Sequence, residues 1–246
     1  MTVHFVGAGP GAPDLLTLRA VSLIASAPVC VYAGTYIDDE VLAHCPPDVR
    51  LVDTQHLDLD QIIGHLEEAH EAGQDAVRLC SGDPSIYSAL AEQTKRLDTA
   101  GVPWDVTPGI PAYAAAAAIL GTELTVPEVA QTIILTRTQA RSTKMPETEA
   151  LPLLAKSRAT LALHLAITRI RVLVDDLVPE YGADCPVAVV ANASKPGELV
   201  LTGTLSDIAE QVETAGLRQA AIILVGPALE TGTVKGSHLY DPERRR

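Results

Sequence analysis

The chain has 246 residues, 47% of them hydrophobic and 20% charged, which is enough to bury a core in one or two domains. This composition excludes a disordered chain, a collagen-like repeat and a small disulfide scaffold. Asp and Glu number 31 against 18 Lys and Arg, a net charge of −13, and only 3% of residues are aromatic. A nucleic-acid partner is therefore not expected, because such surfaces need positive charge or aromatic stacking platforms. We expect a protein that acts on a small molecule.

Short apolar strands alternate with helical periods along the first half of the chain. In chain order, the sequence predicts a strand at 3–6, a glycine turn at 7–11, a helix behind a cap at Asp14, a strand at 29–32, a helix at 60–72, a strand at 76–80, a helix from Pro84 to about 100, and a strand at 102–107. This alternation is typical of an α/β fold.

The second half continues the alternation with a change in character. It is predicted to hold an alanine-rich helix ending near 121, a strand at 132–136, a polar loop at 138–148, a strand at 160–165, a helix ending before 182, strands at 187–191 and 199–205, a helix at 206–215 and a strand at 221–225. We therefore predict two α/β domains, 1–112 and 113–246, each with a mixed or parallel sheet covered by helices.

No membrane or secretion segment is expected. The longest apolar run, 112–120, is far shorter than the roughly 18 residues that a membrane-spanning helix needs. The first residues, MTVHFVGAG, lack the basic and apolar regions of a signal peptide. We expect a cytoplasmic protein, and we assign no role to the basic end at 244–246.

The glycine turn after the first strand is compatible with more than one function. Gly7, Gly9 and Ala12 fit the G-x-G-x-x-A fingerprint of dinucleotide-binding folds. Pro10 and Pro13 remove backbone donors that a pyrophosphate would need, and no acidic residue ends the next strand. The pattern therefore disfavours NAD, and a tight turn that needs glycine only for its dihedral angles remains an alternative.

Two further loops follow predicted strands. Ser81-Gly82-Asp83-Pro84 comes after the strand at 76–80, and Pro108-Gly109-Ile110-Pro111-Ala112 comes after the strand at 102–107. Asp83 has the alternative role of capping the helix predicted from Pro84. Because ligands of open α/β sheets bind at the carboxyl ends of the strands, these three loops together predict a binding crevice.

The cysteines and histidines, which could serve covalent catalysis or metal binding, do not show the spacing that either function needs. The four cysteines lie far apart without a C-x-x-C pair, and the seven histidines show no metal-ligand spacing. We expect no metal, and we assign no catalytic residue.

Three motifs carry a resemblance to a known family. They are Gly7-Ala8-Gly9-Pro10-Gly11 followed by Leu15-Leu16-Thr17, the run Val77-Arg78-Leu79 to Ser81-Gly82-Asp83-Pro84 with Tyr87, and Pro108-Gly109-Ile110 before the alanine-rich helix. These runs resemble the main motifs of the tetrapyrrole methylases, which use S-adenosylmethionine. Segments at 160–165, 186–193 and 222–227 resemble the second domain of that family. Ala12 departs from the pattern, since family loops often carry Asp there.

The resemblance implies the tetrapyrrole methylase fold, in which two α/β domains hold S-adenosylmethionine in a cleft and release S-adenosylhomocysteine. It also implies a homodimer. Residues at the matching motif positions are expected to contact the cofactor. They are Pro10, Ser81, Gly82, Asp83, Ile86, Pro111, Ala112, Leu165 and Ala193.

Segments outside the cofactor motifs indicate the substrate. Tyr32–Thr35, Val52–Thr54 and Pro127–Thr132 followed by Leu135–Arg137 resemble the family members that methylate ring carbon 11 of the corrin precursor precorrin-4. The alternatives are a methylase of the same fold that acts on another precorrin or a cobalt-precorrin, an RNA ribose methylase, and a cofactor-binding module without catalysis. The sequence does not decide whether the substrate carries cobalt.

Precorrin-4 is a polycarboxylate, so a chain of net charge −13 has to gather positive groups locally. Arg137, Arg141 and Lys144 follow the strand at 132–136 and are the candidates for binding its carboxylates. Arg169, Arg171 and Lys195 form a second group, and ordinary surface charges are the alternative for all six.

Overall fold

The computed structural model describes residues 1–138 and 144–230. The chain divides into two compact units, Met1–Ala115 and Ala116–Arg246. The division falls inside helix α5 (Ala112–Leu120). No helix among the described residues combines the length and apolarity needed to cross a membrane.

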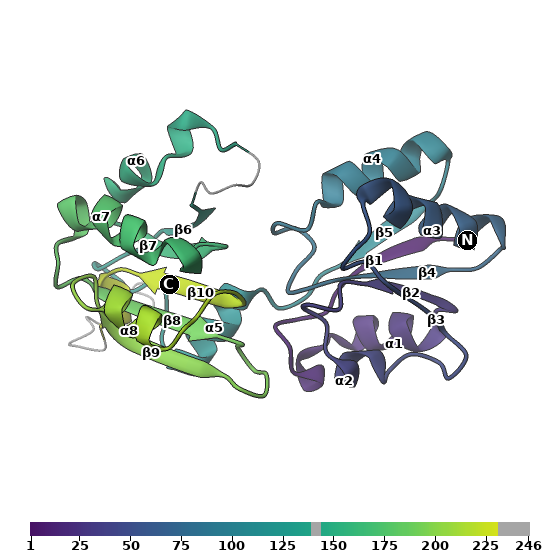
Figure 1. Cartoon of the computed structure of the whole chain (residues 1–246), viewed down its shortest axis with the longest axis horizontal. Coiled ribbons are helices and arrows are strands. Elements are labelled where there is room, and N and C mark those ends of the chain that lie inside the picture. Colours follow the sequence, from purple (N-terminus) through teal and green to yellow (C-terminus); the bar gives the residue numbers. More distant parts are fainter. Residues whose placement is uncertain (139–143, 231–246) are drawn as a thin grey trace, which may run out of the picture. The chain divides into compact units, whose positions relative to one another are not determined.

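The first unit is built on a parallel five-stranded sheet (Figure 1). Its strands are β1 (Val3–Gly7), β2 (Val29–Tyr32), β3 (Arg50–Asp53), β4 (Ala76–Cys80) and β5 (Trp104–Thr107), in the order β3-β2-β4-β1-β5. All of the pairings are parallel, so the carboxyl ends of these strands lie at one edge of the sheet.

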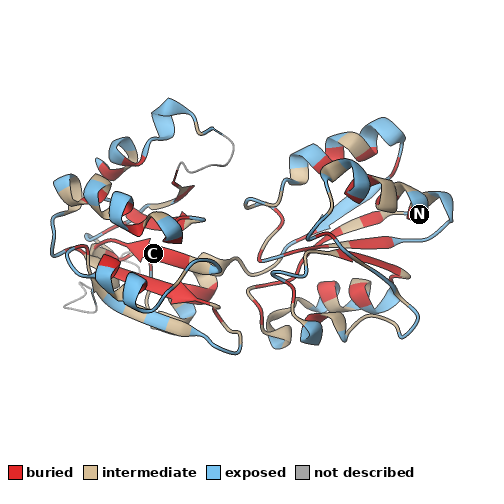
Figure 2. Ribbon diagram, viewed as in Figure 1, coloured by how far each residue is buried: buried red, intermediate tan, exposed pale blue. Residues whose placement is uncertain are grey.

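Helices cover both faces of this sheet (Figures 1 and 2). Their bounds are Leu18–Ser26 for α1, Asp39–Leu42 for α2, Leu59–Glu71 for α3 and Leu90–Ala100 for α4. Val6, Val77 and Leu79 face a core with α1 and α2, while Phe5 and Ala76 face a core with α3 and α4. Alternating strand residues therefore fill two separate cores, as a sheet buried on both faces requires.

Local capping decides where these helices begin. Thr17, not Asp14, caps α1 by accepting a hydrogen bond from the backbone N–H of Ala20 at 3.1 Å, and Asp14 lies in a short 3-10 helix. Asp58 and Gln61 form a reciprocal capping box at α3. The cap predicted at Asp14 is therefore wrong, whereas the helix predicted at 60–72 agrees with α3 to within one residue at each end.

The helix predicted from Pro84 was placed wrongly, because α4 begins only at Leu90. Tyr87 and Ala89 both adopt left-handed backbone conformations, with φ of 52° and 55°. An α-helix cannot pass through such residues, so 84–89 forms an irregular segment. The sequence analysis also missed β3, α2 and α6 (Leu151–Ala155).

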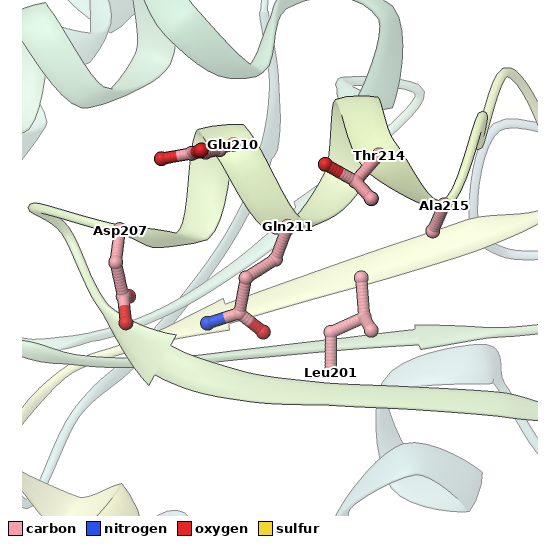
Figure 3. Close-up of a pocket in the computed structure, with 6 residues that line it drawn as sticks. All are labelled: Leu201, Asp207, Glu210, Gln211, Thr214 and Ala215. Atoms are coloured by element: carbon pink, nitrogen blue, oxygen red, sulfur yellow. The ribbon is translucent and has the colours of Figure 1, made fainter.

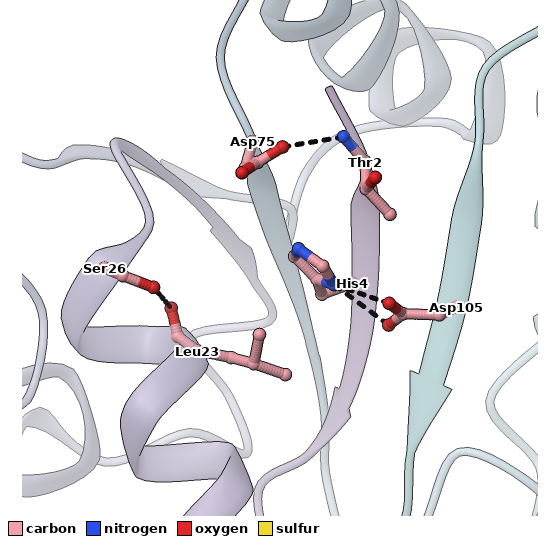
Figure 4. A network of polar contacts seen from close by, with 6 residues as sticks. All are labelled: Thr2, His4, Leu23, Ser26, Asp75 and Asp105. Carbon is pink, nitrogen blue, oxygen red and sulfur yellow. Dashed lines mark hydrogen bonds and ion pairs between the residues drawn. The ribbon is translucent and has the colours of Figure 1, made fainter.

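Polar contacts fix the amino-terminal strand of the first unit (Figure 4). The backbone N–H of Thr2 donates to Asp75 Oδ1 at 2.7 Å, and His4 Nδ1 lies 2.9 Å from both carboxylate oxygens of Asp105 on β5. These contacts join β1 and the residue before it to the two neighbouring strands of the sheet, at the start of β4 and on β5.

The second unit is built on a mixed sheet of order β6-β7-β10-β8-β9. Its strands are β6 (Ile133–Arg137), β7 (Thr160–His164), β8 (Pro186–Ala191), β9 (Leu199–Thr204) and β10 (Ala221–Val225). β6 and β7 are parallel, and β10 is antiparallel to both β7 and β8. The carboxyl ends of β6, β7 and β8 therefore share one edge.

Helices α6, α7 (Ile170–Tyr181) and α8 (Ile208–Thr214) share one apolar core with this sheet. Fully buried residues of that core come from the strands and the helices alike, among them Leu161, Leu173 and Ile208. Short 3-10 helices lie at Pro13–Leu15, Glu147–Glu149, Ile167–Arg169 and Pro227–Leu229.

Candidate functional site

Two loops at the carboxyl edge of the first sheet pair through their backbones. Gly82 donates its N–H to the carbonyl of Gly9 at 2.7 Å, and Gly9 donates to the carbonyl of Gly82 at 3.1 Å. Gly9 and Gly82 have φ of 70° and 67°, a conformation that favours glycine. The loop after β1 and the loop after β4 are therefore one rigid unit.

The third loop packs against the first two without room for side chains. A Cβ atom on Gly7 would lie 2.4 Å from the backbone nitrogen of Gly109, and a Cβ on Gly109 would lie 2.2 Å from the carbonyl oxygen of Gly82. Gly7 and Gly109 are therefore required because two backbones approach too closely for a side chain. Gly82 is required for a different reason, its left-handed backbone conformation.

Asp83 links the second loop to the third. Its Oδ2 accepts the backbone N–H of Gly109 at 2.9 Å, and its Oδ1 accepts the N–H of Ser85 at 2.8 Å and the Ser85 hydroxyl. Burial raises the pKa of Asp83, but the hydrogen bonds from Ser85 and Gly109 outweigh it, and the net pKa is lowered. The carboxylate thus stays ionised and holds the loops together, while the helix that it was expected to cap begins later.

Most of the expected cofactor residues lie on these loops. Within the first unit the set is Pro10, Ser81, Gly82, Asp83, Ile86, Pro111 and Ala112. The position of a Cβ on Gly82 would be 3.6 Å from Pro111 Cα, so the second and third loops are neighbours there as well. The fold of one unit therefore brings together residues that are far apart in the sequence.

A fourth loop joins this edge after β2. Asp53, the last residue of β3, accepts the backbone N–H groups of Gly34 at 2.9 Å and Gln55 at 3.0 Å, and these bonds lower its pKa. A Cβ on Gly34 would lie 2.5 Å from an Asp53 carboxylate oxygen. Sequence reasoning missed this contact, although both residues lie in the segments that resemble methylases acting on precorrin-4.

The second unit has strained backbone at the edge where β7 and β8 end. Leu165 follows β7 with φ of 53°, Asn192 and Ser194 follow β8 with φ of 49° and 61°, and Ala220 precedes β10 with φ of 51°. Asn192 donates its N–H to the carbonyl of Ala220 at 2.8 Å. Left-handed residues other than glycine are costly and concentrate at functional sites, so this edge is the candidate site of the second unit.

Both expected cofactor residues of this unit lie at that edge. Leu165 has a side chain that is 62% exposed, whereas Ala193 is buried. His164 precedes Leu165, and burial lowers its pKa, so the imidazole is neutral at neutral pH. Arg137 is the register partner of His164 on β6, which places one of the expected substrate residues at the same edge.

The other positive candidates differ in their surroundings. Lys144 lies 3.5 Å from Glu147, with both side chains exposed, and Arg171 forms an ion pair with Glu213. Arg141 falls outside the described residues. Lys195 directly follows the strained Ser194, which brings it to the edge that carries Leu165.

A solvent-open groove lies elsewhere, between α8 and β9 (Figure 3). It is lined by Leu201, Asp207, Glu210, Gln211, Thr214 and Ala215. None of these is an expected site residue. Asp207 accepts the backbone N–H of Thr204, which pairs with Pro186 at the start of β8. This part of the groove therefore lies at the opposite end of β8 from Ala191 and the candidate site. The groove is therefore not the candidate site.

The chemistry available at these edges is binding and orientation. Among the described residues, no cluster of three or more His, Cys, Asp and Glu side chains is placed to hold a metal ion, and all four cysteines are free thiols. Rigid backbone loops with ionised or amide groups suit a ligand that needs precise placement.

Known proteins resemble this chain along its full length. The model of the tetrapyrrole (corrin/porphyrin) methylases matches residues 2–209. A precorrin-4 C(11)-methyltransferase of Rhodococcus erythropolis is 53% identical over 246 residues, covering 100% of this chain and 99% of its own length.

Two solved structures resemble the fold closely. The X-ray structure of a cobalt precorrin-4 methyltransferase of cobalamin biosynthesis has a TM-score of 0.90 at 35% identity, covering 93% of this chain and 96% of that one. A uroporphyrin-III C-methyltransferase of Thermus thermophilus, in complex with S-adenosylhomocysteine, has a TM-score of 0.78 at 27% identity, covering 96% of each chain.

Proposed function

Because the chain belongs to the tetrapyrrole (corrin/porphyrin) methylases, we propose that it transfers a methyl group from S-adenosylmethionine to ring carbon 11 of precorrin-4. The products are precorrin-5 and S-adenosylhomocysteine. The observation that carries the proposal is the 53% identity to a precorrin-4 C(11)-methyltransferase along the full length of both chains. The expectations of family, fold, reaction and cofactor made from the sequence agree with it.

The reaction needs little covalent chemistry from the protein. When bound, S-adenosylmethionine supplies an electrophilic methyl group; a carbon–carbon bond forms at ring carbon 11, the sulfur keeps the electron pair of the broken bond, and the macrocycle loses a proton. The residues of this chain have to place the two reactants in line and keep water out. The backbone-paired loops at Gly9 and Gly82 suit that task, because two reciprocal hydrogen bonds hold them together.

We assign the cofactor contacts to Pro10, Ser81, Gly82, Asp83, Ile86, Pro111, Ala112, Leu165 and Ala193. The interlocked loops of the first unit and the strained edge of the second support this assignment. Titration calorimetry of the full chain should give one S-adenosylhomocysteine site per chain and no binding of NAD. Binding of NAD without S-adenosylhomocysteine would overturn the assignment.

Metal-free precorrin-4 is the substrate that we favour. The chain shares 53% identity with the relative named for precorrin-4 and 35% with the solved methylase named for cobalt precorrin-4. Turnover of purified protein with metal-free and cobalt-bearing precorrin-4, followed by mass spectrometry of the product, tests both the activity and the preference. No methylation of either compound would refute the proposed function.

We also propose that the enzyme is a cytoplasmic homodimer without membrane or nucleic-acid partners. The net charge of −13 supports the absence of a nucleic-acid surface. Sedimentation equilibrium of the full chain should give twice the 25.9 kDa mass of one chain. The mass of a single chain would refute the proposed dimer but would leave the proposed methyl transfer unaffected.

Arg137, Arg141 and Lys144 are proposed to bind peripheral carboxylates of the macrocycle. Replacing Arg141 by Ala should raise the KM for precorrin-4 about tenfold to a hundredfold, because a charge-assisted hydrogen bond is worth about 1.5–3 kcal/mol. The kcat should change little, since such a contact stabilises ground state and transition state alike. Steady-state kinetics with both substrates varied will measure this.

The matched control is Arg158→Ala. Arg158 is exposed and precedes β7, at the opposite end of that strand from His164. Its replacement should leave both KM values unchanged. If Ala at all three candidate positions also leaves the KM for precorrin-4 unchanged, the loop does not bind substrate, and Arg169, Arg171 and Lys195 become the candidates.

A further inference from the structure

A half-buried arginine lies in β4, the strand that leads into the loop carrying Asp83. Arg78 is in the middle strand β4, on the face shared by Ala76 and Cys80, which belongs to the core with α3 and α4. Its Nε donates to Gln93 Oε1 at 3.1 Å, and its Nη1 donates to the carbonyls of Leu79 at 3.2 Å and Val31 at 3.4 Å.

The groups that accept hydrogen bonds from the Arg78 guanidinium are uncharged. Its hydrogen bonds in the described structure go to one side-chain amide and two backbone carbonyls. Burial lowers the pKa of the guanidinium, although it remains a cation at any physiological pH. Partial burial of a cation whose hydrogen bonds go to neutral groups is unfavourable, so a structural or functional reason for Arg78 at this position has to be sought.

Gln93 links Arg78 to the irregular segment 84–89 by hydrogen bonds. Its side chain, on α4, is only 2% exposed. Its Nε2 donates to the carbonyl of Ser88 at 3.0 Å and to that of Ala89 at 3.3 Å. Because Arg78 carries only donors, it can donate only to the amide oxygen of Gln93, and this fixes the amide nitrogen of Gln93 toward the carbonyls of Ser88 and Ala89.

The segment held in this way is strained. Tyr87 and Ala89 are both left-handed, and the Ser88 hydroxyl donates to the carbonyl of Pro84. Such conformations persist only where surrounding contacts impose them. Within 84–89 lies Ile86, one of the residues assigned above to the cofactor.

We propose that Arg78 and Gln93 are positioning residues for S-adenosylmethionine: through the carbonyls of Ser88 and Ala89 they hold the segment 84–89 in its strained conformation and so place Ile86 and Asp83 against the cofactor. This inference rests on the proposed function. It predicts weaker binding of the cofactor with unchanged binding of the macrocycle, because the residues proposed to bind the macrocycle belong to the second unit.

The test is Gln93→Glu in the full chain. A glutamate still accepts from Arg78 and compensates its charge, but it has no donor for the carbonyls of Ser88 and Ala89. We expect the dissociation constant for S-adenosylhomocysteine and the KM for S-adenosylmethionine to rise about tenfold, with the KM for precorrin-4 unchanged. Hydrogen exchange of the amides of 85–89 should become faster.

The matched control is Gln61→Glu on α3. It makes the same chemical change in the same unit, and a glutamate can still accept the backbone N–H of Asp58 in the capping box. Cofactor affinity should stay at the wild-type value. A tenfold loss in this control as well would overturn the inference, because added negative charge alone would explain the result.

Arg78→Lys is the second variant, for the case that Gln93→Glu does not fold. Lysine keeps a cation and a donor for Gln93 but loses the planar fork, so an intermediate loss of about threefold is expected. Wild-type affinity in a folded Gln93→Glu, or in Arg78→Lys where the first variant is unfolded, would overturn the inference. Failure of the wild-type chain itself to bind S-adenosylhomocysteine would instead refute the proposed function.

Discussion

Replacing Gly109 by Ala should reduce affinity for S-adenosylhomocysteine about 100-fold or more and lower the melting temperature. The new Cβ would lie 2.2 Å from the carbonyl oxygen of Gly82 and 2.8 Å from backbone atoms of Gly7. Backbone atoms cannot rotate away as a flexible side chain does, so the three loops have to separate. A cost of about 3 kcal/mol, at the upper end for overpacking, corresponds to that loss of affinity.

The matched control is the same substitution at Gly64, inside helix α3. No atom lies within 4 Å of the position of its Cβ. Alanine is favoured over glycine in a helix interior by about 1 kcal/mol, so Gly64→Ala should raise the melting temperature and leave cofactor affinity unchanged. Calorimetry and thermal denaturation measure both quantities. Wild-type affinity in Gly109→Ala would show that close packing of the loops is not needed for binding.

The position of the loops could be predicted from the sequence because of one topological rule. Strands 3–6 and 76–80 each end in a glycine-bearing loop, and parallel strands place their carboxyl ends at one edge. The interlock of Gly7 with Gly109 could not be predicted. Gly7 and Gly109 are about a hundred residues apart in the sequence and become neighbours only because β1 and β5 pair in the sheet. No local sequence pattern indicates how closely their backbones approach.

The boundaries of α4 show a second limit. Pro84 suits the first turn of a helix, and nothing in the residue types of Tyr87 or Ala89 indicates a left-handed backbone. The conformation is imposed by the amide of Gln93 and, through it, by Arg78. Tertiary contacts have overridden local preference, and they do so beside the expected cofactor residues.

Strand β3 was missed for a different reason. Two of its four residues, Arg50 and Asp53, are charged, and it forms an edge of the sheet with three residues exposed. An exposed edge strand lacks the apolar run by which buried strands are recognised. The contact of Asp53 with Gly34 was therefore missed as well.

Replacing Asp83 by Ala should weaken binding of S-adenosylhomocysteine about 30-fold. The change removes the acceptor of the Gly109 N–H and of both Ser85 donors. Hydrogen bonds to a charged group are worth about 1.5–3 kcal/mol each, and solvent access to this partly exposed carboxylate reduces the total to about 2 kcal/mol. The apparent affinity falls because only the fraction of molecules with the loops in place binds the ligand.

The pH dependence of wild-type binding offers an independent check on Asp83. Its folded pKa is lowered, so the stabilisation by the carboxylate is complete above the unfolded value of about 3.9 and is lost as the pH falls through the folded value. Affinity for S-adenosylhomocysteine should therefore be constant from about pH 8 to pH 5.

Asp48→Ala is the control for Asp83→Ala, because it removes the same charge from an exposed loop. It should bind S-adenosylhomocysteine as the wild type does. If Asp83→Ala also binds as the wild type does, the link from Asp83 to Gly109 contributes to the fold but not to the cofactor site, and the three loops are held for binding by the glycine contacts alone.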